Sequence, residues 1–309
     1  MLNIKPLSKP LQKIAQLELG EIPDRIPTDL ENFKQWIGQQ PHLRTCQDDQ
    51  FLIQFLRGCK YSQERAKEKL DRYYSLMTKY PEIFSVTDVD EAIFRKHHNV
   101  GSLLPLPLPL NDSGPRIMLF RFNYSPKTVN IETVFRSINA IPQVLMMDDP
   151  HACICGTIYL VDMSQVTAGH LLQLTPPFIK KIVTYYENTL PLRVKAIYCL
   201  NITKLTEQLL KLILSFMSEK LRRRVFICGK DFQSLYATMP QKYFPQEYGG
   251  LNGQLDKISS EFNKKWDEYR TYFQNNVNYG TIEALRPGNP IDFDDMFGLG
   301  GSFRKLDVD

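Results

Sequence analysis

The sequence predicts an α/β domain preceded by a helical region, and two patterns support this fold class. Beyond about residue 115, short apolar runs alternate with helix-like segments, whereas before about residue 95 apolar residues recur at helical spacing. Continuous apolar runs with helices between them are typical of a largely parallel sheet covered by helices. The 309 residues, 43 % of them hydrophobic and 23 % charged, suffice for such a core.

The helical region is clearest in SQERAKEKLDRYYSLMTKYP, residues 62–81. Ala66, Leu70, Tyr73 and Met77 recur at helical spacing and form one apolar stripe, with charged residues opposite. We expect a helix here that begins after the capping serine and ends at the proline.

The segment GSLLPLPLPLNDSGPR, residues 101–116, connects the helical region to the α/β region. Its alternating prolines exclude a helix and favour an extended polyproline conformation, and Asn-Asp-Ser-Gly predicts a turn. Two interpretations of Leu103 to Leu110 stay open: a loop packed against the domain surface, or a second element that touches a membrane.

The α/β region contains four predicted strands. They are 116–122, 156–163, 194–200 and 224–228, and helices are expected near 130–146, 171–189 and 203–222. A last helix with Phe262, Trp266, Tyr269 and Phe273 on one face should pack back on the body, and the Gly-rich remainder should run as an extended surface tail. The predicted division is a helical domain (1–95), an α/β domain (96–255) and a C-terminal helix with tail (256–309).

Several classes of function lack support in the sequence. The formal net charge of +4 is too small to indicate nucleic-acid binding by itself. There is no zincin, nucleophile-elbow, P-loop or dinucleotide-binding signature, and the five histidines and six scattered cysteines form no metal-ligand set. We therefore predict no catalytic site, cofactor or metal, buried reduced thiols, and a cytoplasmic protein without a membrane-spanning segment.

Positive charge is concentrated in one region. Residues 180–230 contain eleven Lys and Arg against three acids, and Arg193 and Lys195 enter a predicted strand pointing the same way. Lys220 and the arginines 222–224 follow the next helix. Clustered cations repel one another unless an anion neutralises them, so this pattern fits a site for a phosphorylated lipid headgroup or, alternatively, a solvated basic face without a ligand.

The predicted helix 203–220 is unusually apolar. One face consists of Leu205, Leu209, Leu212, Ile213 and Phe216, and further leucines and a methionine widen it. Such a face fits a helix buried on two sides in a core, or a movable helix that covers a lipid cavity and can turn toward a membrane.

Several stretches, taken in order, resemble the CRAL-TRIO lipid-binding family. They are DDQFLIQFLRGCKYSQERAKEKL, LVDMSQ, TLPLRVKAIYCLN, FMSEKLRRRVFICG and FPQEYGG, within residues 28–275. The resemblance is closest to the branch of the alpha-tocopherol transfer protein and cellular retinaldehyde-binding protein, and the ending GSFRKLDVD looks like the arthropod members.

The resemblance implies that the sheet floors an apolar cavity gated by the helix 203–220. It implies that a basic cleft with Arg193, Lys195, Lys220 and Arg224 binds the phosphoinositide phosphatidylinositol bisphosphate, and we add the neighbouring Arg222 to this site. Cys59 stands where the branch has another cleft arginine, and Arg57 or Lys60 is the expected substitute. The cavity is expected to be lined by Phe135, Ile138, Val161, Ile182, Tyr185, Leu192, Val194 and Ile197.

The leading hypothesis is an intracellular carrier that holds a retinoid, a tocopherol-like molecule or another isoprenoid lipid. It would transfer this ligand to phosphoinositide-bearing membranes, associating with them peripherally and reversibly. The alternative is a phosphoinositide-sensing adaptor that docks a protein partner without transferring lipid. A lipid-modifying enzyme ranks last, because the chain lacks a recognisable nucleophile and base.

Overall fold

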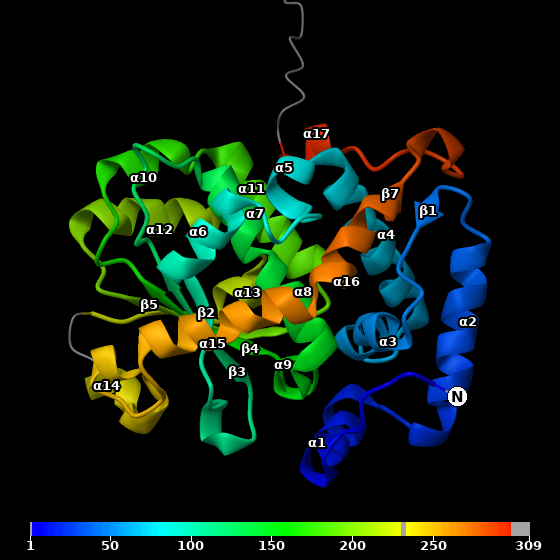
Figure 1. Cartoon of the computed structure of the whole chain (residues 1–309), viewed down its shortest axis with the longest axis horizontal. Coiled ribbons are helices and arrows are strands. Elements are labelled where there is room, and N and C mark those ends of the chain that lie inside the picture. The colour runs from blue at the N-terminus through cyan, green and yellow to red at the C-terminus, as the bar shows by residue number, and fades with distance from the viewer. Residues whose placement is uncertain (1, 230–232, 298–309) are drawn as a thin grey trace, which may run out of the picture.

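A five-stranded sheet forms the centre of the structure, a computed structural model that describes residues 2–229 and 233–297 (Figure 1). The strand order is β2-β3-β4-β5-β6, with β2 antiparallel to β3 and all other neighbours parallel. The strands are β2 Leu103–Pro105, β3 Arg116–Arg121, β4 Thr157–Asp162, β5 Val194–Leu200 and β6 Val225–Ile227, and a separate ribbon pairs β1 Leu43–Arg44 with β7 Gly280–Thr281. The predicted α/β domain with a largely parallel sheet is confirmed.

Helices precede, cover and follow this sheet. The N-terminal set, blue to cyan in Figure 1, is α1 Lys9–Ile14 with a π-helical turn η1 Ala15–Leu19, α2 Ile26–Gly38, α3 Asp49–Gly58, α4 Gln63–Lys79, α5 Pro81–Phe84 and α6 Ala92–Val100. Those of the α/β region are α7 Ile131–Ile138, α8 Ala140–Asp148, α9 Pro150–Cys155, α10 Ala168–Gln173, α11 Pro176–Thr184 with a π-helical turn η4 Tyr185–Thr189, α12 Lys204–Phe216, α13 Glu219–Arg222 and α14 Gln233–Tyr236. The C-terminal ones are α15 Leu255–Glu268, α16 Arg270–Asn275 and α17 Phe293–Phe297.

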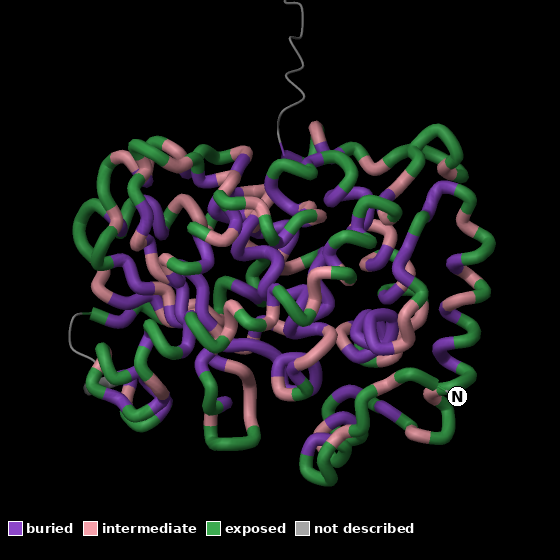
Figure 2. Tube along the Cα trace, in the orientation of Figure 1, coloured by how far each residue is buried: buried purple, intermediate pink, exposed green. Residues whose placement is uncertain are grey.

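The two faces of the sheet have different neighbours, because successive side chains of a strand point to opposite sides. On one face, Tyr159 and Val161 of β4 look toward α7, α11 and α12. On the other, Ile158 and Leu160 pack against α15 and the segment that follows α14. Figure 2 shows the chain buried along the sheet and along α3, with exposure concentrated on the outer helices and loops.

The leucine-proline connector contains a strand rather than an isolated polyproline segment. Leu103 and Leu104 are buried in β2, which adds an antiparallel edge to the sheet beside β3. Proline is tolerated at such an edge because it has no N–H to donate to a second neighbour. Leu106 is also fully buried, so most of this segment packs on the domain, although Leu108 stays exposed.

The helix expected over 203–222 is broken. Met217 has an extended backbone conformation, so α12 ends at Phe216, and the Ser218 side chain then caps the short helix α13 by accepting a hydrogen bond from the Leu221 N–H. Lys220 lies within α13 rather than at the C-terminus of one long helix.

The C-terminal segment up to Phe297 packs against the end of α4, whereas an extended surface tail was expected. Phe293 and Phe297 of α17 are buried against Tyr80, and the carboxylate of Asp294 lies 3.1 Å from Lys79 Nζ. The acidic segment 291–297 is thus bonded to the end of α4. The stretch GSFRKLDVD, residues 301–309, lies outside the described residues.

Candidate functional site: an apolar cavity beside a basic cleft

An apolar cavity of about 180 Å³ lies between one face of the sheet and the helices α7, α11 and α12. The strands contribute alternate residues, as expected for one face of a pleated sheet. The lining consists of Leu103, Phe120, Phe122, Phe135, Ile138, Tyr159, Val161, Met163, Leu174, Phe178, Ile179, Ile182, Val183, Tyr186, Val194, Ile197, Cys199, Leu210, Ile213, Met217, Leu221 and Val225. Among these side chains only two tyrosines and one cysteine carry a polar group.

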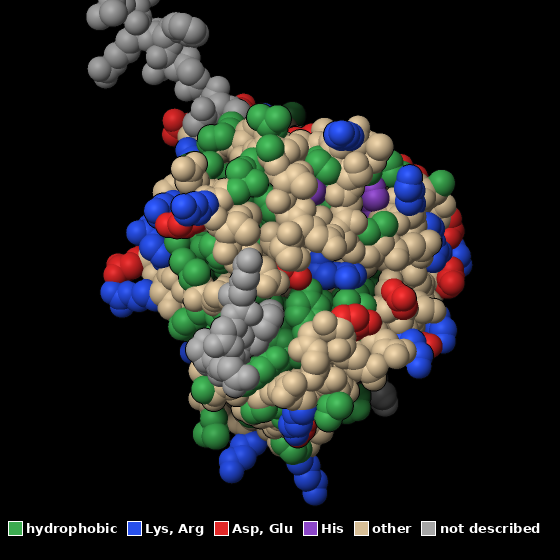
Figure 3. All heavy atoms as spheres, turned by 90° about the vertical axis from the view of Figure 1, so that its left-hand side faces the viewer, with side chains coloured by type: hydrophobic (Ala, Val, Ile, Leu, Met, Phe, Trp, Pro, Cys, Tyr) green, Lys and Arg blue, Asp and Glu red, His purple; other side chains and the backbone are tan. Residues whose placement is uncertain are grey.

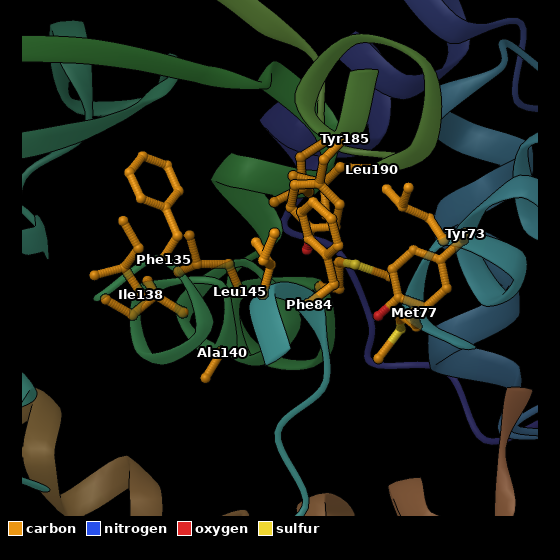
Figure 4. Packing of buried hydrophobic residues seen from close by; sticks show 14 of the residues in the cluster. Tyr73, Met77, Phe84, Phe135, Ile138, Ala140, Leu145, Tyr185 and Leu190 are labelled. Carbon is orange, nitrogen blue, oxygen red and sulfur yellow. The ribbon is translucent and has the colours of Figure 1, made fainter. Parts of the chain in front are cut away.

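Six of the eight residues expected in the cavity line it: Phe135, Ile138, Val161, Ile182, Val194 and Ile197. Tyr185 does not line the cavity, because its ring stacks on Phe84 at 4.9 Å between centroids. Figure 4 shows Tyr185 beside Phe84 and Leu190, away from Phe135 and Ile138. The neighbouring residue, Tyr186, faces the cavity instead.

Leu192 also lies outside the cavity lining and borders the basic cleft described below. It follows the π-helical turn η4 by a few residues, so its orientation depends on a local irregularity that helical or strand spacing does not predict.

The apolar face of α12 is divided between the cavity and the surface. Of the five residues expected on its gating face, Ile213 lines the cavity, together with Leu210, which was expected only to widen the face. Leu209 is buried beside the cavity, whereas Leu205 is 44 % exposed. Leu212 and Phe216 are half-buried against the core, and Lys180 Nζ lies 5.4 Å from the Phe216 ring centroid.

Exposed apolar side chains occur on the side of the molecule where α12 lies. Figure 3 looks onto the side on which α10 and α12 lie in Figure 1, and hydrophobic side chains gather in the middle of this face. Leu172 of α10 is 82 % exposed, and Phe226 and Ile227 of the edge strand β6 are exposed as well. An apolar surface next to a half-buried helix is suited to contact another apolar surface.

A basic cleft of about 620 Å³ lies next to the cavity. We call Arg193, Lys195, Lys220 and Arg224 its sheet wall, because they come from β5, α13 and the residues flanking β5 and β6. Its helical wall is Lys60, Arg65 and Lys69, from α4 and the turn before it. Of the described residues that line the cleft, only Glu18 and Glu187 carry a carboxylate.

The backbone of Arg193, in the sheet wall, lies close to the backbone of Gly156. Gly156 has φ +86°, and a Cβ atom there would lie 2.3 Å from the Arg193 carbonyl oxygen, so this close approach requires glycine. The Arg193 guanidinium donates to the Ile154 carbonyl, while its buried Nε has no partner among the described residues. Burial lowers the pKa of Arg193, which an anion in the cleft would offset.

Glu18, at the end of the π-helical turn η1, enters the cleft from the N-terminal segment. Its carboxylate lies 3.0 Å from Lys195 Nζ and 4.0 Å from Arg193, and Lys195 chiefly lowers its pKa. Glu18 therefore partly neutralises the sheet wall. No local sequence pattern predicts this contact, since 177 residues separate the partners.

The turn before α4 brings Lys60 into the cleft. Gly58 lies so close to the Pro191 carbonyl oxygen that a Cβ atom would be 2.2 Å from it. Lys60 and Tyr61 both have positive φ, a conformation that costs non-glycine residues roughly 1–2 kcal/mol each. The Tyr61 hydroxyl donates to Glu21 at 2.7 Å, a contact that holds this turn.

Arg57 does not reach the cleft, contrary to expectation. It forms a buried pair with Glu21, donating from Nε at 2.8 Å and from an Nη at 3.2 Å, and both side chains are 3 % exposed. Arg222 also points away from the cleft lining and donates to the Met217 carbonyl. Cys59 itself is buried at the edge of the cleft.

Arg65 and Lys69 are cleft residues that sequence reasoning missed. They are four residues apart on α4 and therefore share a helix face, which is the one signal that could have singled them out. Lys69 Nζ donates to the carbonyl oxygens of Glu187 and Leu190, and burial lowers its pKa to about 8.

Comparisons with known proteins match two segments of the chain. Residues 22–94 match the description "Pinta-like, UBA domain", and residues 111–250 match "CRAL/TRIO domain". Residues 111–250 are therefore similar to a CRAL/TRIO domain. The mouse alpha-tocopherol transfer protein-like protein is 28 % identical over 260 residues, covering 82 % of this chain and 73 % of that protein. Rat clavesin-1 is 28 % identical over 241 residues, covering 76 % and 67 %.

A solved structure, the crystal structure of Sfh5, also aligns with the chain. It matches with a TM-score of 0.45 and 12 % identity, covering 86 % of this chain and 99 % of that one.

Residues 111–250, which match the CRAL/TRIO domain, contain most of the cavity lining and the entire sheet wall, whereas the helical wall lies within residues 22–94, the Pinta-like segment. Tyr186, Val194 and Leu221 line both the cavity and the cleft. One layer of side chains thus separates the apolar space from the basic one. Among the described residues, no helix has the length and apolar character needed to cross a membrane.

Proposed function

We propose that this protein is a non-enzymatic carrier of a hydrophobic small molecule, a retinoid, tocopherol-like or other isoprenoid lipid, which it delivers to phosphoinositide-bearing membranes. The observation that carries the proposal is the layer shared by the apolar cavity and the basic cleft, formed by Tyr186, Val194 and Leu221. An anion bound on one side of this layer can influence a ligand on the other. The name of the alpha-tocopherol transfer protein-like relative also supports a transfer function.

The apolar lining suits a hydrophobic ligand, whose burial contributes about 25 cal/mol per Å² of apolar surface. The cavity volume of about 180 Å³ is below the roughly 300–1,000 Å³ of typical ligand pockets. Loading therefore requires widening. We propose that α12 moves, because it supplies Leu210 and Ile213 to the lining and has non-helical residues at both ends.

Phosphoinositide binding is assigned to the sheet wall, Arg193, Lys195, Lys220 and Arg224, with Lys60 nearby. A phosphate there would form charge-assisted hydrogen bonds with groups that otherwise have few partners. Capture of a headgroup favours an open conformation only if that conformation binds it more tightly. In this proposal the membrane offers both ligand and α12 an apolar environment, and the protein associates with it reversibly.

Charge reversal at the cleft tests the proposal. Arg193→Glu combined with Lys195→Glu should abolish the preference for phosphoinositide vesicles in a flotation assay, because it replaces two attractions by two repulsions. Affinity for a fluorescent retinoid or tocopherol should stay within about twofold, since neither charged group lies in the apolar lining. Equal loss of both activities would mean that the pair is structural.

The moving helix is tested by Phe216→Asp. The Phe216 ring is half-buried against the core, so a carboxylate there opposes its entry into a bilayer. We expect slower transfer of a fluorescent ligand between vesicles, with Lys211→Ala on the exposed face of α12 as the control. Unchanged transfer would contradict movement of α12, and headgroup binding without any transfer would favour the adaptor alternative.

A further inference from the structure

Among the described residues, no carboxylate forms an ion pair with the helical wall of the cleft, Lys60, Arg65 and Lys69. Glu18 bonds to the sheet wall, and Glu187 accepts hydrogen bonds from Ser218. Arg65 is exposed and has no ion pair or hydrogen bond among the described residues, and the Lys69 ammonium bonds only to backbone carbonyls. Unpaired cations on one wall of a cleft are a natural site for an anion.

The two walls come from different parts of the fold. The helical wall belongs to α4 and the turn before it, and the sheet wall to β5, α13 and the residues flanking β5 and β6. Glu18 pairs with Lys195 of the sheet wall and also interacts with Lys60, while Glu187 interacts with Lys69. Among the described residues no carboxylate pairs with Arg65, so a phosphate bound beside Arg193 leaves Arg65 without a bonded counter-charge. Both walls border one cleft of about 620 Å³, within the range of small-molecule pockets.

We infer that Arg65 and Lys69 form a second phosphate subsite beside the sheet wall, at which they bind one phosphate of the bisphosphate headgroup that the family resemblance implies. This inference rests on the proposed function, because it assumes that the sheet wall binds the first phosphate. It assigns a role to two residues of the Pinta-like segment. A bound polyphosphate would also link that segment to the CRAL/TRIO domain through one ligand.

Isothermal titration with inositol 1-phosphate and inositol 1,4,5-trisphosphate tests the inference on the full chain. The unaltered protein should bind the trisphosphate more tightly. Arg65→Ala should weaken trisphosphate binding by roughly tenfold, the loss expected for one charge-assisted contact, and should leave monophosphate binding within twofold. Lys69→Gln should behave likewise. Arg223→Ala is the matched control, since Arg223 is exposed near the cleft but does not line it.

Three results would overturn the inference. They are trisphosphate affinity unchanged by Arg65→Ala, an equal loss for both ligands, or the same loss in Arg223→Ala. Because Arg65 is exposed, its variant should fold even if Lys69→Gln does not. Lys195→Ala should weaken both ligands; if the unaltered protein binds neither ligand nor phosphoinositide vesicles, the proposed function fails as well.

A parallel titration with vesicles containing phosphatidylinositol 4,5-bisphosphate tells a lipid headgroup from a free inositol polyphosphate as the natural ligand. A lipid headgroup as the natural ligand predicts tighter binding to these vesicles than to the free trisphosphate, since Leu17 at the cleft edge is 76 % exposed and can contact acyl chains. Equal affinities would indicate a free inositol polyphosphate in the same subsite. In both cases Arg65→Ala should reduce binding.

Discussion

Glu18 competes with any anion for the sheet wall, so replacing Glu18 should raise the affinity for a phosphorylated headgroup. In Glu18→Gln the 3.0 Å pair with Lys195 is lost, and so is the repulsion between the Glu18 carboxylate and an incoming phosphate. Both side chains of the pair are partly exposed, 49 % and 33 %, so the pair contributes about 0.2–1 kcal/mol. Repulsion between two charges about 4 Å apart in water is roughly 1 kcal/mol.

Together these contributions predict that Glu18→Gln binds the headgroup more tightly by about 1–2 kcal/mol, which is roughly 5- to 30-fold. Titration of the variant with inositol 1,4,5-trisphosphate at low salt measures the gain, and higher salt should shrink it. The control is Glu219→Gln, which removes an exposed carboxylate paired with Arg223 outside the cleft lining. Unchanged or weaker binding in Glu18→Gln would refute the competition.

Two further predictions concern Lys69 and Arg57. Burial lowers the pKa of Lys69 to about 8; Arg72 and Arg65 lower it further, whereas Cys59 and Glu187 raise it. The charged form of Lys69, which an anion prefers, is therefore lost as pH rises through 8. Trisphosphate affinity should fall up to roughly tenfold between pH 7 and pH 9, and Lys69→Gln should remove this step; a flat profile in the unaltered protein would contradict the role of Lys69. Arg57→Ala should lower the free energy of unfolding in urea by about 3–5 kcal/mol, because it leaves the buried Glu21 carboxylate without a counter-charge, while headgroup affinity stays within twofold. Lost affinity with normal stability would instead show that Arg57 binds the headgroup.

The sheet could be predicted from sequence because its central strands are continuous apolar runs. The expected strands 116–122, 156–163 and 194–200 lie within two residues of β3, β4 and β5. The strand β2 was missed because a proline-rich segment does not resemble a strand. Proline is compatible with β2 only because this strand lies at the edge of the sheet. The break at Met217 was missed because helical periodicity of apolar residues continues across it.

The cavity lining was expected from the family resemblance, whereas several contacts of the cleft could not be predicted from any local pattern. Phe135, Val161 and Ile197 lie on faces that spacing defines. Tyr185 was misplaced because its ring stacks on Phe84, and the neighbouring Tyr186 lines the cavity instead. Contacts such as Glu18 with Lys195 join distant parts of the chain, and no local pattern specifies them.

The most direct test of the carrier proposal is mass spectrometry of the small molecule that the purified protein retains after exposure to a total lipid extract from its natural source. The proposal predicts one hydrophobic small molecule, such as a retinoid or another isoprenoid, bound at a ratio of one per chain. A heterogeneous mixture of phospholipids, or no retained molecule, would contradict it.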